Sequence, residues 1–268
     1  MNDQDNFLTA DEIEISHEYQ DQGYAIRTIE NIEALDWIRN LFINLIRKNL
    51  TLKENVTDSD LFDLIHAELD ITQLNDFRLA LIQQMNETKG FRSRYYQIAK
   101  PYLDAIVGNE IAMQSRVNLS IQLPGDDSSL LATHADTWSG DSPFEVVVWL
   151  PLVDCYKTKS MYILPPEKNI NLNKDFKGMS GKNSEDLFQS IESDVQWIDI
   201  NYGEVMIFNQ SLPHGNRINQ ENETRWSMNC RFKGLFSPYG DKKIGEFFEP
   251  ITTKAASISG LNYQYPEL

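Results

Sequence analysis

Two side chains that bind metals stand one residue apart in the middle of the chain. His134 and Asp136 form a His-x-Asp pair just after the apolar stretch Leu130-Leu131-Ala132. In an extended segment residues i and i+2 point to the same face, so the imidazole and the carboxylate are presented side by side. Two neighbouring positions of a metal's coordination sphere require such a pair. A His-x-Asp pair is common in proteins, and alone it is a weak indication of a metal site.

His214 is the third candidate ligand. It follows the apolar run Val205–Phe208 and a short loop, and Gly215 comes directly after it. Two histidines and one carboxylate on one face of a metal leave the opposite face open. This arrangement is diagnostic of non-haem iron(II) oxygenases, because oxygen and a bidentate co-substrate bind there together, whereas zinc usually has a closed site or one open position. We therefore predict that His134, Asp136 and His214 are the iron(II) ligands and the catalytic residues.

Arg225 and Ser227 follow His214 and open a strand-like run, where they share one face. A guanidinium fork binds a terminal carboxylate through two hydrogen bonds, and a neighbouring hydroxyl can add another. The far carboxylate of 2-oxoglutarate is such a ligand. In isolation, Arg225 would more often pair with a surface carboxylate. The ordered set His-x-Asp, His-Gly and Arg-x-Ser arises by chance much less often.

Two polar residues precede the His-x-Asp pair. Asn118 and Gln122 share one face of an alternating segment, and the opposite face carries Val117, Leu119, Ile121 and Leu123. Polar side chains on the inner face of a β-sandwich are costly unless they are paired. We expect Asn118 and Gln122 to line the pocket and contact the co-substrate. The alternative is that they face solvent.

The other histidines, one tryptophan and the two cysteines have simpler interpretations. His17 lies in an acidic stretch and is expected at the surface, and His66 is expected as a core or boundary residue of a helix. Trp138 either shapes the substrate mouth or packs. Cys155 and Cys230 lie in apolar runs and are predicted to be buried free thiols, since two cysteines cannot form a disulfide framework.

The elements that position these residues change in character along the chain. Apolar residues recur at three- and four-residue steps in the first part, which predicts helices over Asn31–Leu50, from near Asp58 to Leu69, over Ile71–Glu87, and over Phe91–Lys100 with a restart after Pro101. After residue 115 short runs of β-forming residues alternate with turn residues. The predicted strands are Val117–Leu123, Phe144–Val153, Ser160–Leu164, Val195–Ile200, Glu204–Phe208 and Thr224–Phe236.

This pattern indicates one domain over residues 1–268 with a mainly β fold and N-terminal helices. Residues 1–114 form the helical part, 115–250 the β core and 251–268 a C-terminal tail. Residues 167–194 are rich in Lys, Asn, Ser and Gly, and we expect a long insertion there with one short helix, Glu185–Glu192. Long connections of this kind tend to be lids or disordered segments.

The net charge of −16 and the pI of about 4.6 restrict the partners. A surface this acidic repels phosphate backbones and anionic lipid, so no nucleic acid is expected. The first residues lack the pattern of a secretory signal, and no apolar run approaches membrane-spanning length. We expect a cytoplasmic protein without membrane insertion and with a small-molecule substrate. The sequence leaves open whether the chain forms a homo-oligomer.

The ordered motifs resemble the iron(II)/2-oxoglutarate oxygenase superfamily of double-stranded β-helix (jelly-roll, cupin-like) proteins. The closer similarity is to phytanoyl-CoA-dioxygenase-like members and to oxygenases of bacterial carbohydrate-biosynthesis clusters. The resemblance covers roughly residues 115–250 and includes Leu123–Asp126, Val148–Val153, Ser160–Pro165 and Arg231–Tyr239. One departure is Met161-Tyr162, where the family often has small residues.

The resemblance implies that His134, Asp136 and His214 hold iron(II), that Arg225 binds 2-oxoglutarate and that Ser227 assists. The implied reaction uses O2, releases succinate and CO2, and hydroxylates a sugar or a sugar-containing precursor of a surface polysaccharide, nucleotide-linked or acidic. Halogenating relatives replace the carboxylate ligand, so Asp136 favours hydroxylation. An oxygenase acting on a lipid or acyl thioester, a cupin-like metal hydrolase, a non-catalytic sugar-binding protein and a structural protein with a coincidental motif are the alternatives.

Overall fold

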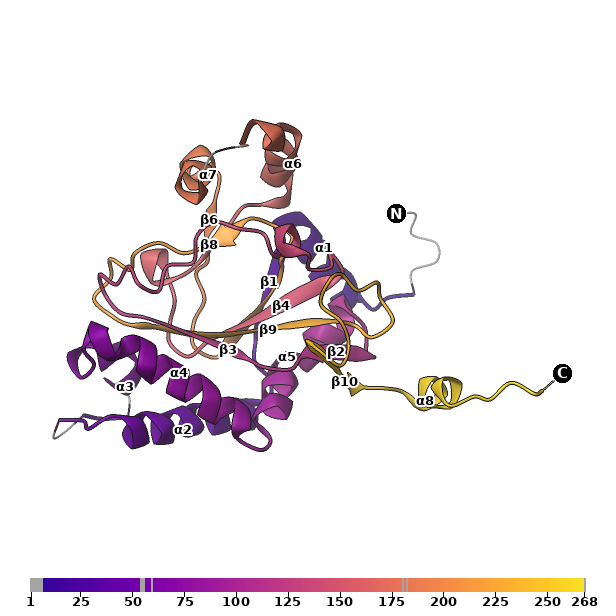
Figure 1. The fold of residues 1–268 in the computed structure, drawn as a ribbon, viewed down its shortest axis with the longest axis horizontal. Helices are drawn as coiled ribbons and strands as arrows, with labels where there is room; N and C mark the ends of the chain where they lie inside the picture. The colour runs from indigo at the N-terminus through magenta and orange to yellow at the C-terminus, as the bar shows by residue number, and fades with distance from the viewer. Residues whose placement is uncertain (1–6, 54–55, 59, 180, 182, 268) are drawn as a thin grey trace.

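The N-terminal helices of the computed structural model form a layer against a β-sheet (Figure 1). The structure describes residues 7–53, 56–58, 60–179, 181 and 183–267. The helices of this part are α1 (Ala10–Gln22), α2 (Ile32–Asn49), α3 (Asp60–Asp63), the short 3-10 helix η1 (Ile65–Ala67), α4 (Ile71–Glu87) and α5 (Phe91–Ile106). In α2 the predicted apolar stripe is buried at Leu35, Ile38, Phe42 and Leu45, whereas Ile32 is exposed. The Asn31 side chain accepts a hydrogen bond from the first turn.

Two of the predicted helices differ in extent from the structure. Helix α5 runs through Pro101 without a break. Pro101 and Gln97, whose carbonyl loses its helical donor there, are both exposed, so water can replace the missing bond. The predicted second helix is reduced to α3 and η1.

The strands form two antiparallel sheets. The larger sheet has the order β1-β7-β4-β9-β2-β10, and β3 also pairs with β9; the smaller has the order β6-β5-β8. The strands are β1 (Tyr24–Thr28), β2 (Ile111–Gln114), β3 (Asn118–Gln122), β4 (Glu145–Pro151), β5 (Tyr162–Ile163), β6 (Gln196–Trp197), β7 (Glu204–Asn209), β8 (His214–Gly215), β9 (Arg225–Gly234) and β10 (Phe248–Thr252).

The prediction of a mainly β fold is too narrow. Helical residues outnumber strand residues in the described part, so the architecture is mixed α/β, with antiparallel sheets flanked by helices. The N-terminal part also supplies β1, which pairs with β7 from Tyr24↔Phe208 to Thr28↔Glu204. That pairing joins segments far apart in the sequence, and local periodicity cannot reveal it.

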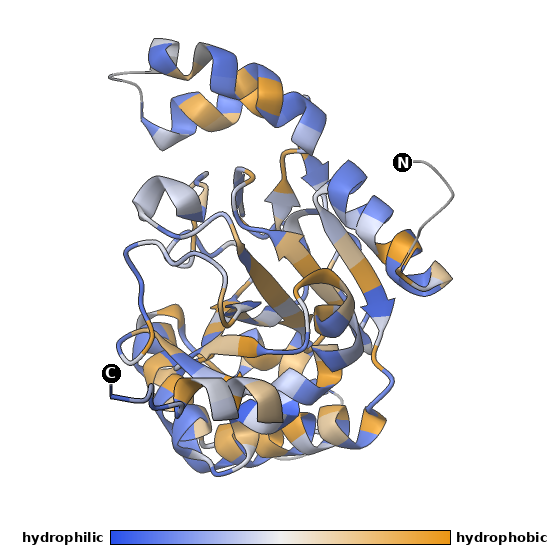
Figure 2. Cartoon of the chain, turned by 90° about the vertical axis from the view of Figure 1, so that its right-hand side faces the viewer, coloured by the Kyte–Doolittle hydropathy of each residue, from blue (hydrophilic) through white to orange (hydrophobic). Residues whose placement is uncertain are grey.

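One hydrophobic core joins the helical layer to the sheet. Trp226 of β9 is fully buried, and its ring makes edge contacts with Phe42, Phe62 and Phe77, which belong to α2, α3 and α4. In Figure 2 the central strands are coloured largely in the orange of hydrophobic residues. Both cysteines are buried and free, as predicted. Because successive strand residues alternate in direction, the neighbours of Trp226 in β9 point to the other side of the sheet.

The insertion carries more helix than predicted. It contains α6 (Pro166–Asp175), the 3-10 helix η4 (Phe176–Met179) and α7 (Ser184–Ile191), and Figures 1 and 2 place α6 and α7 on the side opposite α2 and α4. Residues 180 and 182 of the insertion lie outside the described residues. A last helix, α8 (Ala255–Leu261), follows β10. Within the described ranges, no helix is long and apolar enough to cross a membrane.

Candidate active site

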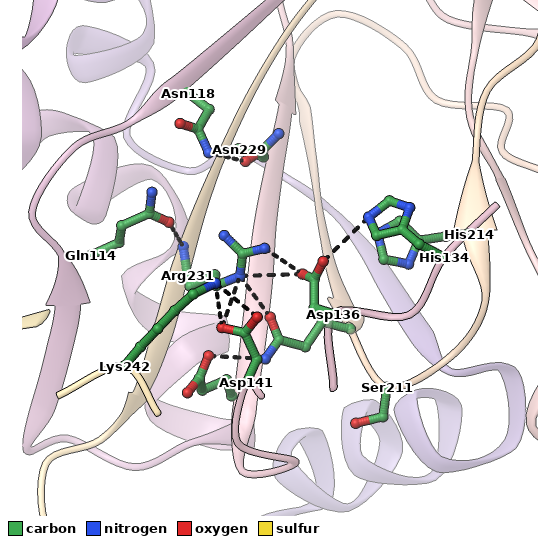
Figure 3. Close-up of polar contacts among 12 residues, drawn as sticks. Gln114, Asn118, His134, Asp136, Asp141, Ser211, His214, Asn229, Arg231 and Lys242 are labelled. Carbon is green, nitrogen blue, oxygen red and sulfur yellow. Dashed lines mark hydrogen bonds and ion pairs between the residues drawn. The ribbon is translucent and has the colours of Figure 1, made fainter. Parts of the chain in front are cut away.

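The two histidines of the predicted triad lie opposite each other on adjacent backbone segments. His134 and His214 form an antiparallel bridge, with N···O distances of 3.0 and 2.8 Å between their backbone groups. Asp136 comes two residues after His134, and its amide donates to the Gln210 carbonyl at 3.0 Å. One ligand atom from each of the three side chains lies within 4.8 Å of the others. The structure therefore brings together the three side chains that the sequence predicts as metal ligands (Figure 3).

Each histidine is oriented by its own backbone neighbourhood. The Nδ1 atom of His134 lies 2.8 Å from the Ala132 carbonyl oxygen, and that of His214 lies 2.9 Å from the Leu212 carbonyl oxygen. A carbonyl oxygen only accepts, so Nδ1 is the donor in both rings and Nε2 is the nitrogen left to bind a metal. The Nε2 atom of His134 is 3.2 Å from Asp136 Oδ1. Both rings are thus held in the orientation that would bind a metal through Nε2.

Burial and neighbouring charges shift the pKa values of the three side chains. Burial by itself raises the pKa of Asp136, but the hydrogen bond with His134 and the charge of Arg231 outweigh it, and the pKa lies well below its usual range. Burial, together with the charge of His134, lowers the pKa of His214 to about 4. Burial also acts to lower the pKa of His134, but its hydrogen bonds to Asp136 and the Ala132 carbonyl raise it overall. At neutral pH Asp136 is ionised and His214 is neutral, as metal ligation requires.

Arg231 holds the outer oxygen of the aspartate. Its Nη2 and Nε atoms lie 2.7 and 3.2 Å from Asp136 Oδ2, and Nε also donates to Gln210 Oε1 at 2.9 Å. The Oδ1 atom is left on the side of the histidines (Figure 3). Asp136 therefore offers one free oxygen to the metal position.

The cluster opens into a cavity of about 270 Å³ that includes side chains from both sheets. Its lining is apolar on β4 and β7 and polar on β3 and β9. The lining residues are Asn118, Ser120, Leu131, His134, Asp136, Val147, Trp149, Met161, Phe208, His214, Gly215, Asn216, Arg225, Ser227, Asn229 and Arg231. A concave site with a few convergent polar groups is typical of small-molecule binding.

Arg225 lies in the same cavity and is almost fully buried. Its Nη1 donates to the Ser160 carbonyl at 3.0 Å and its Nη2 to Ser120 Oγ at 2.9 Å, while Nε has no hydrogen-bond partner. None of the described carboxylates lies within ion-pair distance of this guanidinium. Burial lowers the pKa of Arg225 to about 10, so it still carries its charge at neutral pH. A buried cation without a carboxylate partner is costly, and an anionic ligand would remove that cost.

Of the other three predicted residues, two line the cavity and one does not. Ser227 and Asn118 line the cavity, and the Asn118 amide donates to Asn229 Oδ1 at 2.9 Å. Gln122 is fully buried but is not among the lining residues; its Nε2 donates to the Arg217 carbonyl at 2.7 Å. Gln122 thus supports the segment that follows His214.

Among the lining residues that the sequence did not predict are three polar residues of β3 and β9: Ser120, Asn229 and Arg231. The signal for each was present. Ser120 lies between Asn118 and Gln122 on the same face of β3. The alternation that places Arg225 and Ser227 on one face of β9 continues to Asn229 and Arg231. Only the contact between Arg231 and Asp136 needed the three-dimensional structure.

The Met161-Tyr162 departure shapes the cavity wall. Met161 lines the cavity, and the Tyr162 hydroxyl lies 2.7 Å from Thr133 Oγ1. A Cβ atom at Gly215 would lie 2.6 Å from the Tyr162 hydroxyl and 2.8 Å from the Leu131 carbonyl oxygen. Only glycine fits directly after His214 for this reason.

The remaining residues weighed in the sequence lie outside the metal cluster. Trp138 is 41% exposed, and its ring packs 4.9 Å from that of Phe176 in η4. His66 lies 3.0 Å from Thr224 Oγ1, and His17 is exposed. His66 thus has the predicted role of a satisfied boundary residue, next to the start of β9.

Comparison with known proteins places this geometry in context. No family model matches the chain, and no curated protein matches it. Among solved structures, the carbocyclase SnoK from nogalamycin biosynthesis, described as non-haem and α-ketoglutarate-dependent, has a TM-score of 0.55 at 14% identity, over 92% of this chain and 97% of its own. HygX from Streptomyces hygroscopicus, with nickel and 2-oxoglutarate bound, has a TM-score of 0.52 at 12% identity, over 85% and 88%.

A third structure, the nickel complex of the non-haem monooxygenase ThoJ, has a TM-score of 0.52 at 12% identity, over 92% of this chain and 91% of its own. The chain shares its fold with these non-haem oxygenases. At sequence identities this low, the similarity establishes a shared fold and nothing more. The case for activity therefore depends on the chain's own triad and on Arg225.

Proposed function

We propose that this chain is a non-haem iron(II)- and 2-oxoglutarate-dependent oxygenase that hydroxylates a small molecule. The observation that carries the proposal is that one cavity holds both the 2-His-1-carboxylate cluster and a buried guanidinium with no carboxylate partner among the described residues. This pairing provides for a metal and for a co-substrate that chelates the metal at one end and is anionic at the other.

The residues fit both groups. His134 and His214 would hold iron(II) through Nε2 and Asp136 through Oδ1, because their other polar atoms are already bonded. Arg225 would bind the distal carboxylate of 2-oxoglutarate. Ser120 orients the guanidinium from β3.

The supporting roles follow from position. Ser227 and Asn118 line the cavity and are proposed contacts of the co-substrate. Gln122 acts indirectly through its bond to the Arg217 carbonyl. These roles belong to one oxygenase domain over residues 1–268, with a double-stranded β-helix as its β core.

Iron(II), when bound, supplies the activation of O2 that is coupled to the decarboxylation of 2-oxoglutarate to succinate and CO2. The protein supplies position and surroundings. Val147, Trp149 and Phe208 form an apolar wall that limits water beside the metal position. Arg225 fixes the direction of the co-substrate, and the presence of Asp136 as a ligand favours hydroxylation over halogenation.

A sugar or a sugar-containing precursor of a surface polysaccharide, nucleotide-linked or acidic, is the substrate class that we propose. It rests on the resemblance of segments such as Arg231–Tyr239 to oxygenases of carbohydrate-biosynthesis clusters. SnoK is described as a carbocyclase, so the same fold also hosts an outcome other than hydroxylation.

The test is succinate release from 2-oxoglutarate by the iron-loaded chain, with sugar nucleotides, acidic sugars and acyl thioesters offered separately. We expect at least one sugar compound to stimulate release well above the rate without substrate, and the His214→Ala variant to show neither rate. Stimulation by acyl thioesters alone would contradict the substrate class. Wild-type release no faster than that of His214→Ala under every condition would contradict the reaction.

A further inference from the structure

Arg231 contacts only one of the two carboxylate oxygens of Asp136. Its guanidinium lies 2.7 Å (Nη2) and 3.2 Å (Nε) from Oδ2, while Oδ1 lies 3.2 Å from His134 Nε2 (Figure 3). Arg231 lies on β9, the strand that also carries Arg225, and its side chain contacts the predicted metal ligand Asp136. The side chain is only 16% exposed, so solvent screens this contact weakly.

Buried neighbours fix the direction of the guanidinium. Arg231 Nε donates to Gln210 Oε1 at 2.9 Å, and since arginine only donates, the amide nitrogen of Gln210 must face the other way. There it donates to Glu145 Oε2 at 2.9 Å and to the Ser142 carbonyl at 3.2 Å. Gln210 and Glu145 are both buried. The chain Glu145–Gln210–Arg231–Asp136 therefore has one arrangement of donors and acceptors.

The same glutamine also fixes the backbone of the ligand, because the Asp136 amide donates to the Gln210 carbonyl at 3.0 Å. Asp136 is thus held at its backbone and at one carboxylate oxygen by two connected residues. Residues that hold a metal ligand in this way commonly affect metal affinity by about 10- to 100-fold.

We infer that Arg231, supported by Gln210 and Glu145, is a positioning residue that makes Asp136 bind the metal through Oδ1 alone. The inference rests on the proposed function. A carboxylate with two free oxygens can turn both toward a metal and occupy a position that the co-substrate needs. Charge-assisted hydrogen bonds to Oδ2 prevent this and keep Oδ1 in place before the metal arrives.

Nickel(II) affinity without 2-oxoglutarate tests the inference apart from turnover. Isothermal titration calorimetry would compare the wild-type chain with Arg231→Met, which removes both hydrogen bonds to Oδ2, and with Arg231→Lys, which keeps a charge but loses the fork. The matched control is Arg39→Met. Arg39 is also half-buried, donates to the Leu152 carbonyl at 3.1 Å and lies over the rings of Phe62 and Tyr202, in the helical layer.

We expect Arg231→Met to bind nickel about 10- to 100-fold more weakly than wild type, Arg231→Lys to recover part of the loss, and Arg39→Met to keep the wild-type affinity. Melting temperatures of the metal-free variants separate a structural role from a positioning role. Folded Arg231→Met and Arg231→Lys variants with wild-type nickel affinity would overturn the inference and leave the proposed function standing. A wild-type chain that binds no nickel would overturn both.

Discussion

His134 and His214 face each other across a single pair of backbone hydrogen bonds, and their ring centroids lie 4.4 Å apart. Each ring also donates from Nδ1 to a carbonyl two residues before it. The backbone therefore sets the separation of the two Nε2 atoms that we propose as metal ligands. The proposed metal centre depends on the close approach of these backbone segments, and the first prediction concerns a residue that allows that approach.

Gly215 is that residue. A methyl group there would meet the Tyr162 hydroxyl at 2.6 Å and the Leu131 carbonyl oxygen at 2.8 Å, so the strand that carries His214 must shift. We expect Gly215→Ala to weaken nickel binding by about tenfold, as for other losses of ligand support. Adding Tyr162→Phe removes one of the two close contacts and should recover part of the affinity.

The control for this prediction is Gly260→Ala. Gly260 lies in α8, and among the described residues beyond its chain neighbours and its own helix backbone, no atom lies within 4 Å of the position of its added Cβ. Its replacement should leave nickel affinity unchanged. Equal affinities of Gly215→Ala and wild type, measured by calorimetry, would show that the close packing does not position His214.

Arg225 should have opposite effects on co-substrate binding and on stability. Loss of two charge-assisted hydrogen bonds, each worth about 1.5–3 kcal/mol, predicts that Arg225→Met raises the KM for 2-oxoglutarate by roughly 100-fold or more. Arg225→Lys keeps the charge without the fork and should fall between. Because the buried cation has no carboxylate partner among the described residues, the melting temperature of metal-free Arg225→Met should equal or exceed that of wild type. A lowered melting temperature with an unchanged KM would assign Arg225 to the fold instead.

Ser120 orients that guanidinium through its bond to Nη2 at 2.9 Å. Ser120→Ala removes one hydrogen bond, worth about 1 kcal/mol, and should raise the KM for 2-oxoglutarate roughly fivefold while nickel affinity stays at the wild-type value. Ser93→Ala is the control, since among the described residues the Ser93 hydroxyl bonds only the Gly90 carbonyl at the start of α5. The prediction fails when Ser120→Ala and Ser93→Ala give the same KM.

Lys159 forms ion pairs with two segments of the chain, α3 and the residues just before Arg225. It is fully buried, and its Nζ lies 2.6 Å from Asp63 Oδ1 and 2.6 Å from Glu223 Oε2. The hydrogen bond from Lys159 lowers the pKa of Glu223. Both carboxylates are more than a third exposed, so screening reduces the energy, and we expect Lys159→Met to cost about 1–2 kcal/mol in the free energy of unfolding at pH 7.

The pH dependence of that cost follows from the sign of the shift. A carboxyl whose pKa is lowered by folding contributes stability above its unfolded pKa of about 4.3, and the contribution is lost as pH falls through the folded pKa. Urea unfolding of wild type and Lys159→Met should therefore differ at pH 7 and converge toward pH 3. A difference that is as large at pH 3 as at pH 7 would assign the effect to packing.

The sequence was informative where local pattern and order along the chain carried the signal. The apolar period predicted α2 and α4 nearly to the residue, and alternation predicted β3 and β9. The triad was predictable because the order His-x-Asp, His-Gly and Arg-x-Ser restricts the chemistry, although none of its parts does so alone.

Long-range pairing and the exact extent of very short elements were not predictable. Strand β1 pairs with β7 far along the chain, and β8 has two residues, too few to show a period. The predicted strands Ser160–Leu164 and Val195–Ile200 are present only as the two-residue strands β5 and β6. Helix α6 has only two large apolar residues, Ile170 and Leu172, and their spacing of two does not form an apolar stripe. The bond between Arg231 and Asp136 joins a strand to a loop through folding alone, whereas Ser120 and Asn229 could have been found by extending the alternation.

The most direct test of the central claim is an anaerobic titration of the protein with iron(II) and 2-oxoglutarate, followed by visible absorption. The account predicts a weak metal-to-ligand charge-transfer band that requires both additions, is absent in His214→Ala and needs much more 2-oxoglutarate in Arg225→Met. A wild-type protein that binds iron(II) but shows no such band at saturating 2-oxoglutarate would contradict the account.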